Sequence, residues 1–165
     1  IGLKKIEKAS SMDCIIIRPP LIYGKGVKGN FSNLLKLTAL SVPLLIGAIE
    51  NKRTLVSVEN LVDLITTCVT HPSAKNKIFL VSDDRDLSTP ELICMLSEAG
   101  GHKARIFRIP RIILYFFFKL IGKSSIYEKL CGSMQVNIDY TKSQLDWIPP
   151  YKIEDSLVNC WSSAS

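Results

Sequence analysis

The chain has 165 residues, of which 47% are hydrophobic and 22% are charged, and it carries a net charge of +6. This length and apolar content predict one folded domain, or one domain with a piece of another, and exclude wholesale disorder. The net charge favours an anionic partner, such as a small molecule that carries phosphate. Because no run of five or more Lys or Arg occurs, we expect no nucleic-acid partner.

The first elements along the chain are a helix end and a strand. Residues 1–11 place apolar side chains at helical spacing among lysines, and since the chain begins with Ile1, we expect a partner half upstream. Residues 13–18 contain an apolar run, 14–17, that is rich in β-branched side chains, which predicts a buried strand. Pro19 and Pro20 lack the amide hydrogens of a strand ladder, so we expect pairing to stop there and a Gly-rich loop to follow.

Further strands and helices alternate beyond this loop. The capping-box spacing of Ser88 and Glu91 predicts a helix start, and Gly100 with Gly101 predicts its end. This alternation indicates the α/β class. Short strands are expected at residues 44–47 (strand or turn), 54–58, 77–82 and 104–109, and helices at 30–42, 59–70, 89–99, 111–121, 126–130, 141–145 and 153–161.

The apolar segment at residues 109–122 has two interpretations. It is too short for the ~20 residues that cross a bilayer, so we expect no membrane span. Arg108 and Arg111 precede it and Lys119 and Lys123 follow it, as in helices that lie at a membrane surface. Its length favours a buried helix over that alternative.

The cysteines show no metal-binding or disulfide pattern. None of the five stands in a C-x-x-C arrangement, and most lie in apolar periodic segments. They indicate buried thiols in a reducing compartment, so we expect a cytoplasmic protein without a metal site. The cysteines are Cys14, Cys68, Cys94, Cys131 and Cys160.

Four motifs follow one another in an order typical of one family. Together they resemble the C-terminal part of an extended short-chain dehydrogenase/reductase of the NAD-dependent epimerase/dehydratase family. The pattern is most similar to nucleotide-sugar epimerases and 4-ketoreductases, and the resemblance covers essentially the whole chain. The motifs are Arg18-Pro19-Pro20-Leu21-Ile22-Tyr23-Gly24; Gly26 with Gly29-Asn30-Phe31; Arg53-x-x-x-x-Val58-x-Asn60-Leu61-Val62-Asp63; and Leu145-Asp146-Trp147-x-Pro149-Pro150.

The resemblance implies terminal strands of a Rossmann-type parallel sheet joined to a small, mostly helical substrate-binding domain. Residues 1–27 would be a remnant of the NAD-binding Rossmann domain, and residues 28–165 the substrate-binding domain. The strand near residues 77–82 would return to the Rossmann sheet.

The resemblance also implies binding residues. Pro20, Leu21 and Ile22 match the backbone that faces the nicotinamide end of the cofactor. The matched substrate-binding positions are Asn30, Phe31 and Arg53, with Arg53 gripping a diphosphate through its planar guanidinium. Two alternatives stay open: Arg53 as a solvated turn residue, and Asn30 as a helix cap.

One part of the family's pattern is missing here. A second substrate arginine and an acid are not where the family places them, and Lys129 is the substitute candidate. This departure leaves the sugar open and favours the ketoreductase-like members.

The chain lacks the family's catalytic elements. It contains no Gly-rich dinucleotide motif, and the pair Tyr115 and Lys119 has the family's Y-x-x-x-K spacing but lies in the apolar helix. We therefore expect no catalytic residue in this chain and no tight cofactor binding by the chain alone.

The resemblance finally implies a function for the complete enzyme. That enzyme would transfer hydride between NAD(P) and a UDP-sugar or related nucleotide-diphosphate sugar, as a homodimer. This chain would provide the substrate-binding part, its N-terminal Rossmann half being missing. The alternative is a non-catalytic nucleotide-sugar binding module, or an inactive truncated fragment.

Overall fold

Short strands form three small sheets in the part of the chain that the structure describes. The computed structural model describes residues 13–27 and 30–162, so the helix predicted over residues 1–11 lies outside the described residues. The sheet orders are β1-β5, β2-β4-β6 and β3-β7. The strands are β1 (Ile16–Arg18), β2 (Leu21–Tyr23), β3 (Pro43–Leu44), β4 (Arg53–Ser57), β5 (Ile78–Leu80), β6 (Asp86–Leu87) and β7 (Arg105–Ile106).

The double proline is the point at which the chain changes sheet. Before it, β1 runs parallel to β5, with Ile17 opposite Phe79. After it, β2 runs parallel to β4, with Leu21 opposite Leu55. The prediction that pairing stops at the prolines and gives way to a loop was therefore wrong. Proline removes only its own amide hydrogen, so pairing ends with one partner and resumes with another once ordinary residues return.

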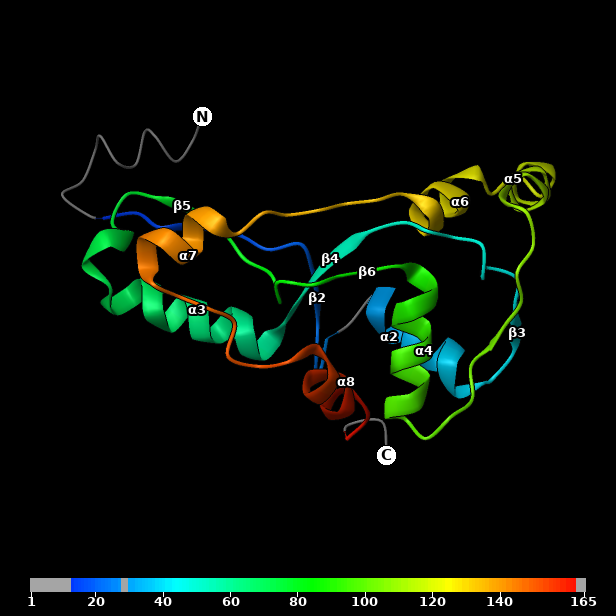
Figure 1. The fold of residues 1–165 in the computed structure, drawn as a ribbon, viewed down its shortest axis with the longest axis horizontal. Helices are drawn as coiled ribbons and strands as arrows, with labels where there is room; N and C mark the ends of the chain where they lie inside the picture. The colour runs from blue at the N-terminus through cyan, green and yellow to red at the C-terminus, as the bar shows by residue number, and fades with distance from the viewer. Residues whose placement is uncertain (1–12, 28–29, 163–165) are drawn as a thin grey trace.

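The helices surround these sheets, and the predicted α/β class is confirmed. Figure 1 shows α3 and α7 beside β1 and β5, α2, α4 and α8 grouped beside β4 and β6, and α5 and α6 together at the far end of the long axis. The helices are α2 (Asn30–Ala39), α3 (Val58–Thr70), η1 (Pro72–Ala74), α4 (Thr89–Ala99), α5 (Arg111–Leu120), α6 (Ser124–Cys131), α7 (Asp139–Leu145) and α8 (Ile153–Trp161).

The predicted capping box at the start of α4 is confirmed. The Ser88 side chain accepts a hydrogen bond from the Glu91 amide, and the Glu91 carboxylate accepts one from the Ser88 amide. The Ser88 amide and the Ser88 hydroxyl, both beside the Glu91 carboxyl, lower the pKa of that carboxyl by hydrogen bonding. The box satisfies two backbone groups that a helix start leaves without intrahelical partners.

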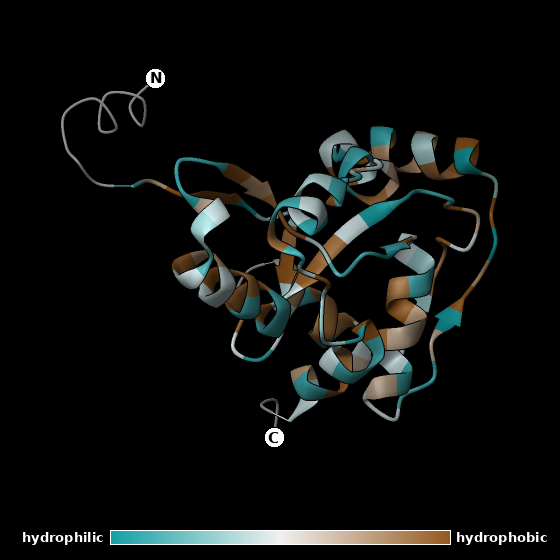
Figure 2. Ribbon diagram, turned by 60° about the vertical axis from the view of Figure 1, so that its left-hand side comes forward, coloured by the Kyte–Doolittle hydropathy of each residue, from teal (hydrophilic) through white to brown (hydrophobic). Residues whose placement is uncertain are grey.

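Three apolar clusters hold the elements together. The first packs α4 and α8 against β2 and β4 through side chains such as Leu55, Leu96 and Leu157. The second packs α3 and α7 against β5 around Phe79, and the third packs α5 and α6 against β3 around Leu114. Figure 2 shows helices with both brown and teal segments, as expected where one helix face packs inward and the other meets solvent.

Three further sequence predictions need correction. The strand predicted as buried over residues 13–18 is β1, and its residues are half-buried or exposed, because one edge of its two-stranded sheet has no partner strand in the described residues. The segment at residues 111–121 is a helix, but it is not buried: Leu114 is its one buried residue, and Phe116 is 59% exposed. The strand predicted over residues 104–109 is reduced to β7, because its partner β3 offers only two residues for pairing. All three errors concern tertiary neighbours, which local periodicity does not specify.

Candidate functional site

A hollow lies where β2 and β4 begin. β4 starts at Arg53, and its neighbour β2 starts at Leu21, directly after the double proline. The hollow has a volume of about 270 Å³ and is lined by Leu21, Arg53, Thr54, Glu128, Gly132, Ser133 and Met134. The structure therefore brings a predicted cofactor residue and the predicted diphosphate residue to one cavity.

The Arg53 guanidinium is held by backbone carbonyl groups from the end of α6. Nη2 donates to the Lys129 carbonyl, and Nε donates to the Gly132 carbonyl at 3.2 Å. A helix C-terminus carries partial negative charge, so a cation is stabilised there. Burial lowers the pKa of Arg53, but a guanidinium remains protonated at neutral pH. These two bonds use two of its five N–H groups, which leaves donors for a further acceptor.

Asn51 holds residues 130–132, at the end of α6, through further hydrogen bonds. Its buried amide nitrogen donates to the Leu130 and Gly132 carbonyls at 3.1 and 3.0 Å. Its amide oxygen accepts from the Thr89 amide at 2.8 Å, at the start of α4. Asn51 is thus a positioning residue that fixes residues 130–132 between β4 and α4. Sequence reasoning missed it, because a polar residue in a basic turn gives no local indication of burial.

Of the predicted cofactor residues, Leu21 and Ile22 belong to β2 and Pro20 precedes it. β2 is the edge of its three-stranded sheet in the described part of the chain, so alternate backbone groups point away from β4. The Ile22 side chain packs against the second apolar cluster and Leu21 against the first. Their side chains therefore support the core, and the backbone is what they can offer to a ligand.

The other predicted substrate residues are dispersed. Phe31 is only 1% exposed and packs on Tyr23, with ring centroids 5.6 Å apart, so its side chain is a core element. Lys129 is exposed on α6 and is not among the residues that line the hollow; only its carbonyl engages Arg53. Asn30 begins α2, but its side chain lies outside the described part, as does Lys28.

A half-buried carboxylate joins three elements and was missed by sequence reasoning. Asp83 accepts hydrogen bonds from the Tyr23 hydroxyl at 2.7 Å, the Ser57 amide at 3.0 Å and the Asn60 side chain at 2.7 Å. Burial raises the pKa of Asp83, although these donors lower it in part, and burial raises the pKa of Tyr23 as well. Asn60 in turn bonds both backbone groups of Tyr151. This network fixes the ends of β2 and β4 beside α3.

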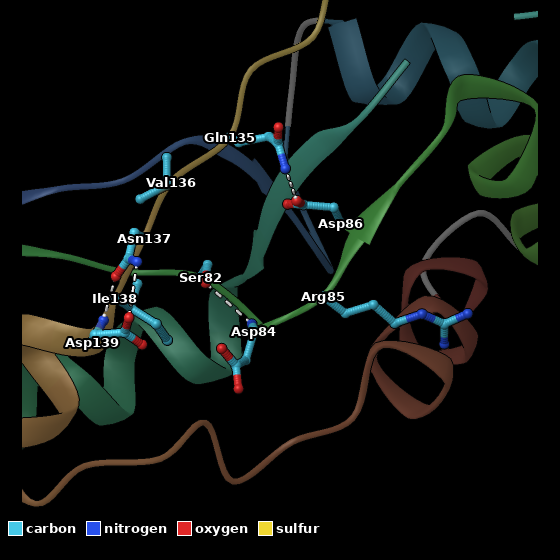
Figure 3. Close-up of a pocket in the computed structure, with 9 residues that line it drawn as sticks. All are labelled: Ser82, Asp84, Arg85, Asp86, Gln135, Val136, Asn137, Ile138 and Asp139. Atoms are coloured by element: carbon cyan, nitrogen blue, oxygen red, sulfur yellow. Dashed lines mark hydrogen bonds between the residues drawn. The ribbon is translucent and has the colours of Figure 1, made fainter. Parts of the chain in front are cut away.

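Two other hollows suit an anionic ligand less well. One of about 560 Å³ is lined by Lys52 and Arg108, but also by Glu91, whose carboxylate already accepts the Ser88 amide before α4. Another, of about 410 Å³, contains three aspartates. Figure 3 shows Asp86 held by Gln135 and Arg85 extending away from the other labelled residues. Arg85 pairs with Glu154 at 2.6 Å, so it leaves this hollow acidic.

The remaining candidate groups show no catalytic arrangement. The Lys119 ammonium lies 5.7 Å from the centre of the Tyr115 ring, on a helix that contributes no residue to the lining of the hollow. Among residues 13–27 and 30–162, no cluster of three or more His, Cys, Asp or Glu could hold a metal. Within these same ranges no helix has the length and apolar content to cross a bilayer.

Comparisons with known proteins support the resemblance. No family model matches the chain. Over 156 residues, 94% of this chain and 48% of the relative, it is 46% identical to a UDP-glucose 4-epimerase from Vibrio cholerae. The chain is also 25% identical to the N-acetyl-alpha-D-glucosaminyl-diphospho-ditrans,octacis-undecaprenol 4-epimerase of Escherichia coli O157:H7. That match extends over 154 residues, which are 86% of this chain and 46% of the relative.

Solved structures share the fold. The UDP-glucuronic acid 4-epimerase from Bacillus cereus, solved in complex with NAD, superposes with a TM-score of 0.70 at 16% identity, over 98% of this chain and 47% of that one. The chain spans about half the length of the curated relatives it matches. Over nearly its whole length it is similar to the C-terminal part of extended short-chain dehydrogenases/reductases of the NAD-dependent epimerase/dehydratase type.

Proposed function

We propose that this chain is the substrate-binding part of an NAD-dependent epimerase or reductase that acts on a diphosphate-linked sugar. The observation that carries the proposal is the shared hollow of Arg53 and the first residue of β2. The 46% identity to an epimerase named for UDP-glucose supports it. In the complete enzyme, hydride would pass between the cofactor and a sugar carbon held close to this hollow.

Arg53 would orient the diphosphate. Its fork of N–H donors matches the oxygens of phosphate, and its remaining donors are available beside the two carbonyl bonds. Because Arg53 is also tied to the end of α6, a diphosphate on the guanidinium would be coupled to the position of residues 129–132. The substrate-binding roles of Lys129, Asn30 and Phe31 stay predictions. Because the Phe31 side chain is buried, its main chain would make the contact with substrate.

The residues after the double proline fit the nicotinamide end of NAD(P). The β2 edge offers backbone donors and acceptors for a carboxamide, and Pro20 adds a rigid wall that donates no hydrogen bond. When bound, the cofactor would accept and donate hydride. We expect Pro20, Leu21 and Ile22 to contact it, and tight binding to need the Rossmann half.

The substrate class follows from the chemistry that two relatives share. The Vibrio cholerae relative is named for a UDP-sugar and the Escherichia coli relative for a sugar on a polyprenol diphosphate. Both carry a sugar on a diphosphate, which is the group Arg53 can recognise. We therefore propose a diphosphate-linked hexose as substrate, in a cytoplasmic enzyme that is a homodimer when complete.

Calorimetry with UDP and UDP-glucose tests the role of Arg53. We expect micromolar binding by the chain, and binding about 10- to 100-fold weaker for Arg53→Met, because a charge-assisted hydrogen-bond pair is lost. Arg105→Met, an exposed position on β7, removes the same charge and serves as the matched control. Equal affinities for the two variants would contradict the assignment.

Turnover separates the proposal from its alternatives. Mixed with NAD and UDP-glucose, the isolated chain should not epimerise, and product formation would overturn the view that catalysis needs a further half. Binding without any activity in the complete protein would support the non-catalytic module. Absence of UDP binding would support an inactive fragment.

A further inference from the structure

Helix α5 has two apolar faces, and the fold uses only one. Leu114 and Phe118 face inward onto α6, where the rings of Phe118 and Tyr115 pack on Tyr127. The opposite face is exposed along the whole helix. It consists of Ile112, Ile113, Phe116, Phe117 and Leu120, of which Leu120 is 87% exposed.

These five side chains form one stripe. At 3.6 residues per turn they fall within an arc of about 140°, so a flat surface could contact all of them at once. Large apolar side chains exposed singly need no explanation, but a contiguous stripe on one helix marks an interaction surface. We name these five residues the outer face of α5.

The charge around this face is strongly one-sided. Residues 99–127 contain six Lys or Arg and no Asp or Glu, whereas the rest of the chain contains 15 of each sign, from totals of 21 and 15. The net charge of +6 therefore resides in this one segment. Two of the cations precede α5 and two end or follow it: Arg108, Arg111, Lys119 and Lys123.

We infer that the outer face of α5 docks onto the surface of an anionic lipid bilayer. An apolar stripe between cationic ends matches the acyl boundary below a layer of negative headgroups. The helix has 10 residues, so it lies in the interface and does not cross it.

The charge distribution disfavours other occupants. A second copy of the chain would place the same cations against each other. The partner half expected beside β1 and β5 is remote, since α5 lies at the opposite end of the long axis (Figure 1). The inference does not depend on the proposed diphosphate site, but it places that site close to a membrane, because α6 joins α5 to Arg53.

Vesicle flotation with the purified chain tests the inference. We expect binding to phosphatidylcholine vesicles that contain 30% phosphatidylglycerol, weakening with salt, and little binding to phosphatidylcholine alone. Phe116→Ser with Phe117→Ser should lower the partition coefficient at least about 100-fold, because two large apolar side chains are lost. Lys119→Gln with Lys123→Gln should lower it about 30-fold.

A matched control changes exposed apolar residues elsewhere. Val62→Ser with Ile65→Ser on α3 should leave binding within about twofold of the parent chain. Failure to float with anionic vesicles, or equal binding to neutral ones, would overturn the inference. Concentration-dependent dimerisation that the α5 serine variant abolishes would show that a second copy covers this face. If the serine variant misfolds by circular dichroism, the glutamine variant decides, and UDP affinity should be unchanged throughout.

Discussion

At the scale of single residues, the molecule depends on buried and half-buried polar side chains that each have several hydrogen-bond partners. Asp83 and Asn51 each bind groups from elements distant in sequence, and both are surrounded by donors or acceptors that match them. A buried polar group is stable only when it is hydrogen-bonded. These residues therefore determine how the ends of β2, β4 and α6 meet, and with them the shape of the hollow around Arg53.

Tyr23→Phe tests the Asp83 network. The change removes one donor to a half-buried carboxylate and should lower the free energy of unfolding by about 1.5–3 kcal/mol. It should also raise the pKa of Asp83 further, because the tyrosine bond lowers that pKa. When the pKa of a carboxyl is raised in the native state, its protonated form contributes stability to the native state at acid pH. That contribution is lost as the pH rises through the native pKa. The cost of Tyr23→Phe should therefore grow with pH.

Urea titrations across the acid range, with NMR of the Asp83 carboxyl, measure both effects. Tyr140→Phe is the control, because that ring is half exposed and stacks on Phe79 without a buried partner for its hydroxyl. We expect a change below about 0.5 kcal/mol there. A loss for Tyr23→Phe that stays constant with pH would show that Asp83 does not titrate as its burial implies.

At the scale of elements, helix pairs are held by close contacts at small residues. Gly100 ends α4 against the Trp161 ring of α8, and a Cβ built there would lie 2.6 Å from Trp161 Cζ2. The Trp161 indole also donates to the Leu96 carbonyl at 2.9 Å. The indole is therefore fixed by both packing and hydrogen bonding, and it has little room to move.

Gly100→Ala should separate α4 from α8. We expect a loss of about 1–3 kcal/mol in the free energy of unfolding, because added volume in a packed contact forces side chains from their rotamers. Gly101→Asn is the control: its φ of +71° suits Asn, and a Cβ there meets nothing within 4 Å. Chemical denaturation followed by Trp fluorescence measures both variants. Equal losses would indicate that Trp161 adjusts without cost.

At the scale of the whole molecule, two surfaces lack partners in the described chain. One is the outer face of α5, and the other is the two-stranded sheet of β1 and β5. Ile78 and Leu80 of β5 are exposed, and a short sheet with open edges can pair with another chain. The two surfaces lie at opposite ends of the molecule (Figure 1), so they can be tested separately.

Ile78→Lys should reduce self-association through the sheet. We expect the parent chain to sediment as dimers or larger species at tens of micromolar, because exposed strand edges associate. The variant should sediment as a monomer, since a charge on the edge strand opposes pairing. Val69→Lys, at a more exposed apolar position on α3, should behave like the parent. If Val69→Lys also gave monomers, net charge and not the sheet edge would govern association.

Local chemistry allowed much of this fold to be predicted. The capping box of α4 depends on neighbouring residues and is confirmed, and the strand predicted over residues 77–82 is found as the shorter Ile78–Leu80. The comparisons support the resemblance that the order of motifs carries. Residue type and spacing determine features such as the capping box without knowledge of distant contacts. The resemblance singled out Arg53 and Leu21, but their meeting in one hollow depends on the pairing of β2 with β4, which the residue pattern did not predict.

Only the tertiary structure decided which side chains are exposed and which are buried or hydrogen-bonded to distant residues. Arg53 is held by carbonyls 76 and 79 residues later in the chain, Phe31 is buried against Tyr23, and Asp83 gathers donors from three other elements. The exposure of α5 likewise depends on its neighbours, which cover only the side that carries Leu114 and Phe118. The sequence by itself determined the elements and their charge, whereas burial is a property of the neighbours that folding brings together.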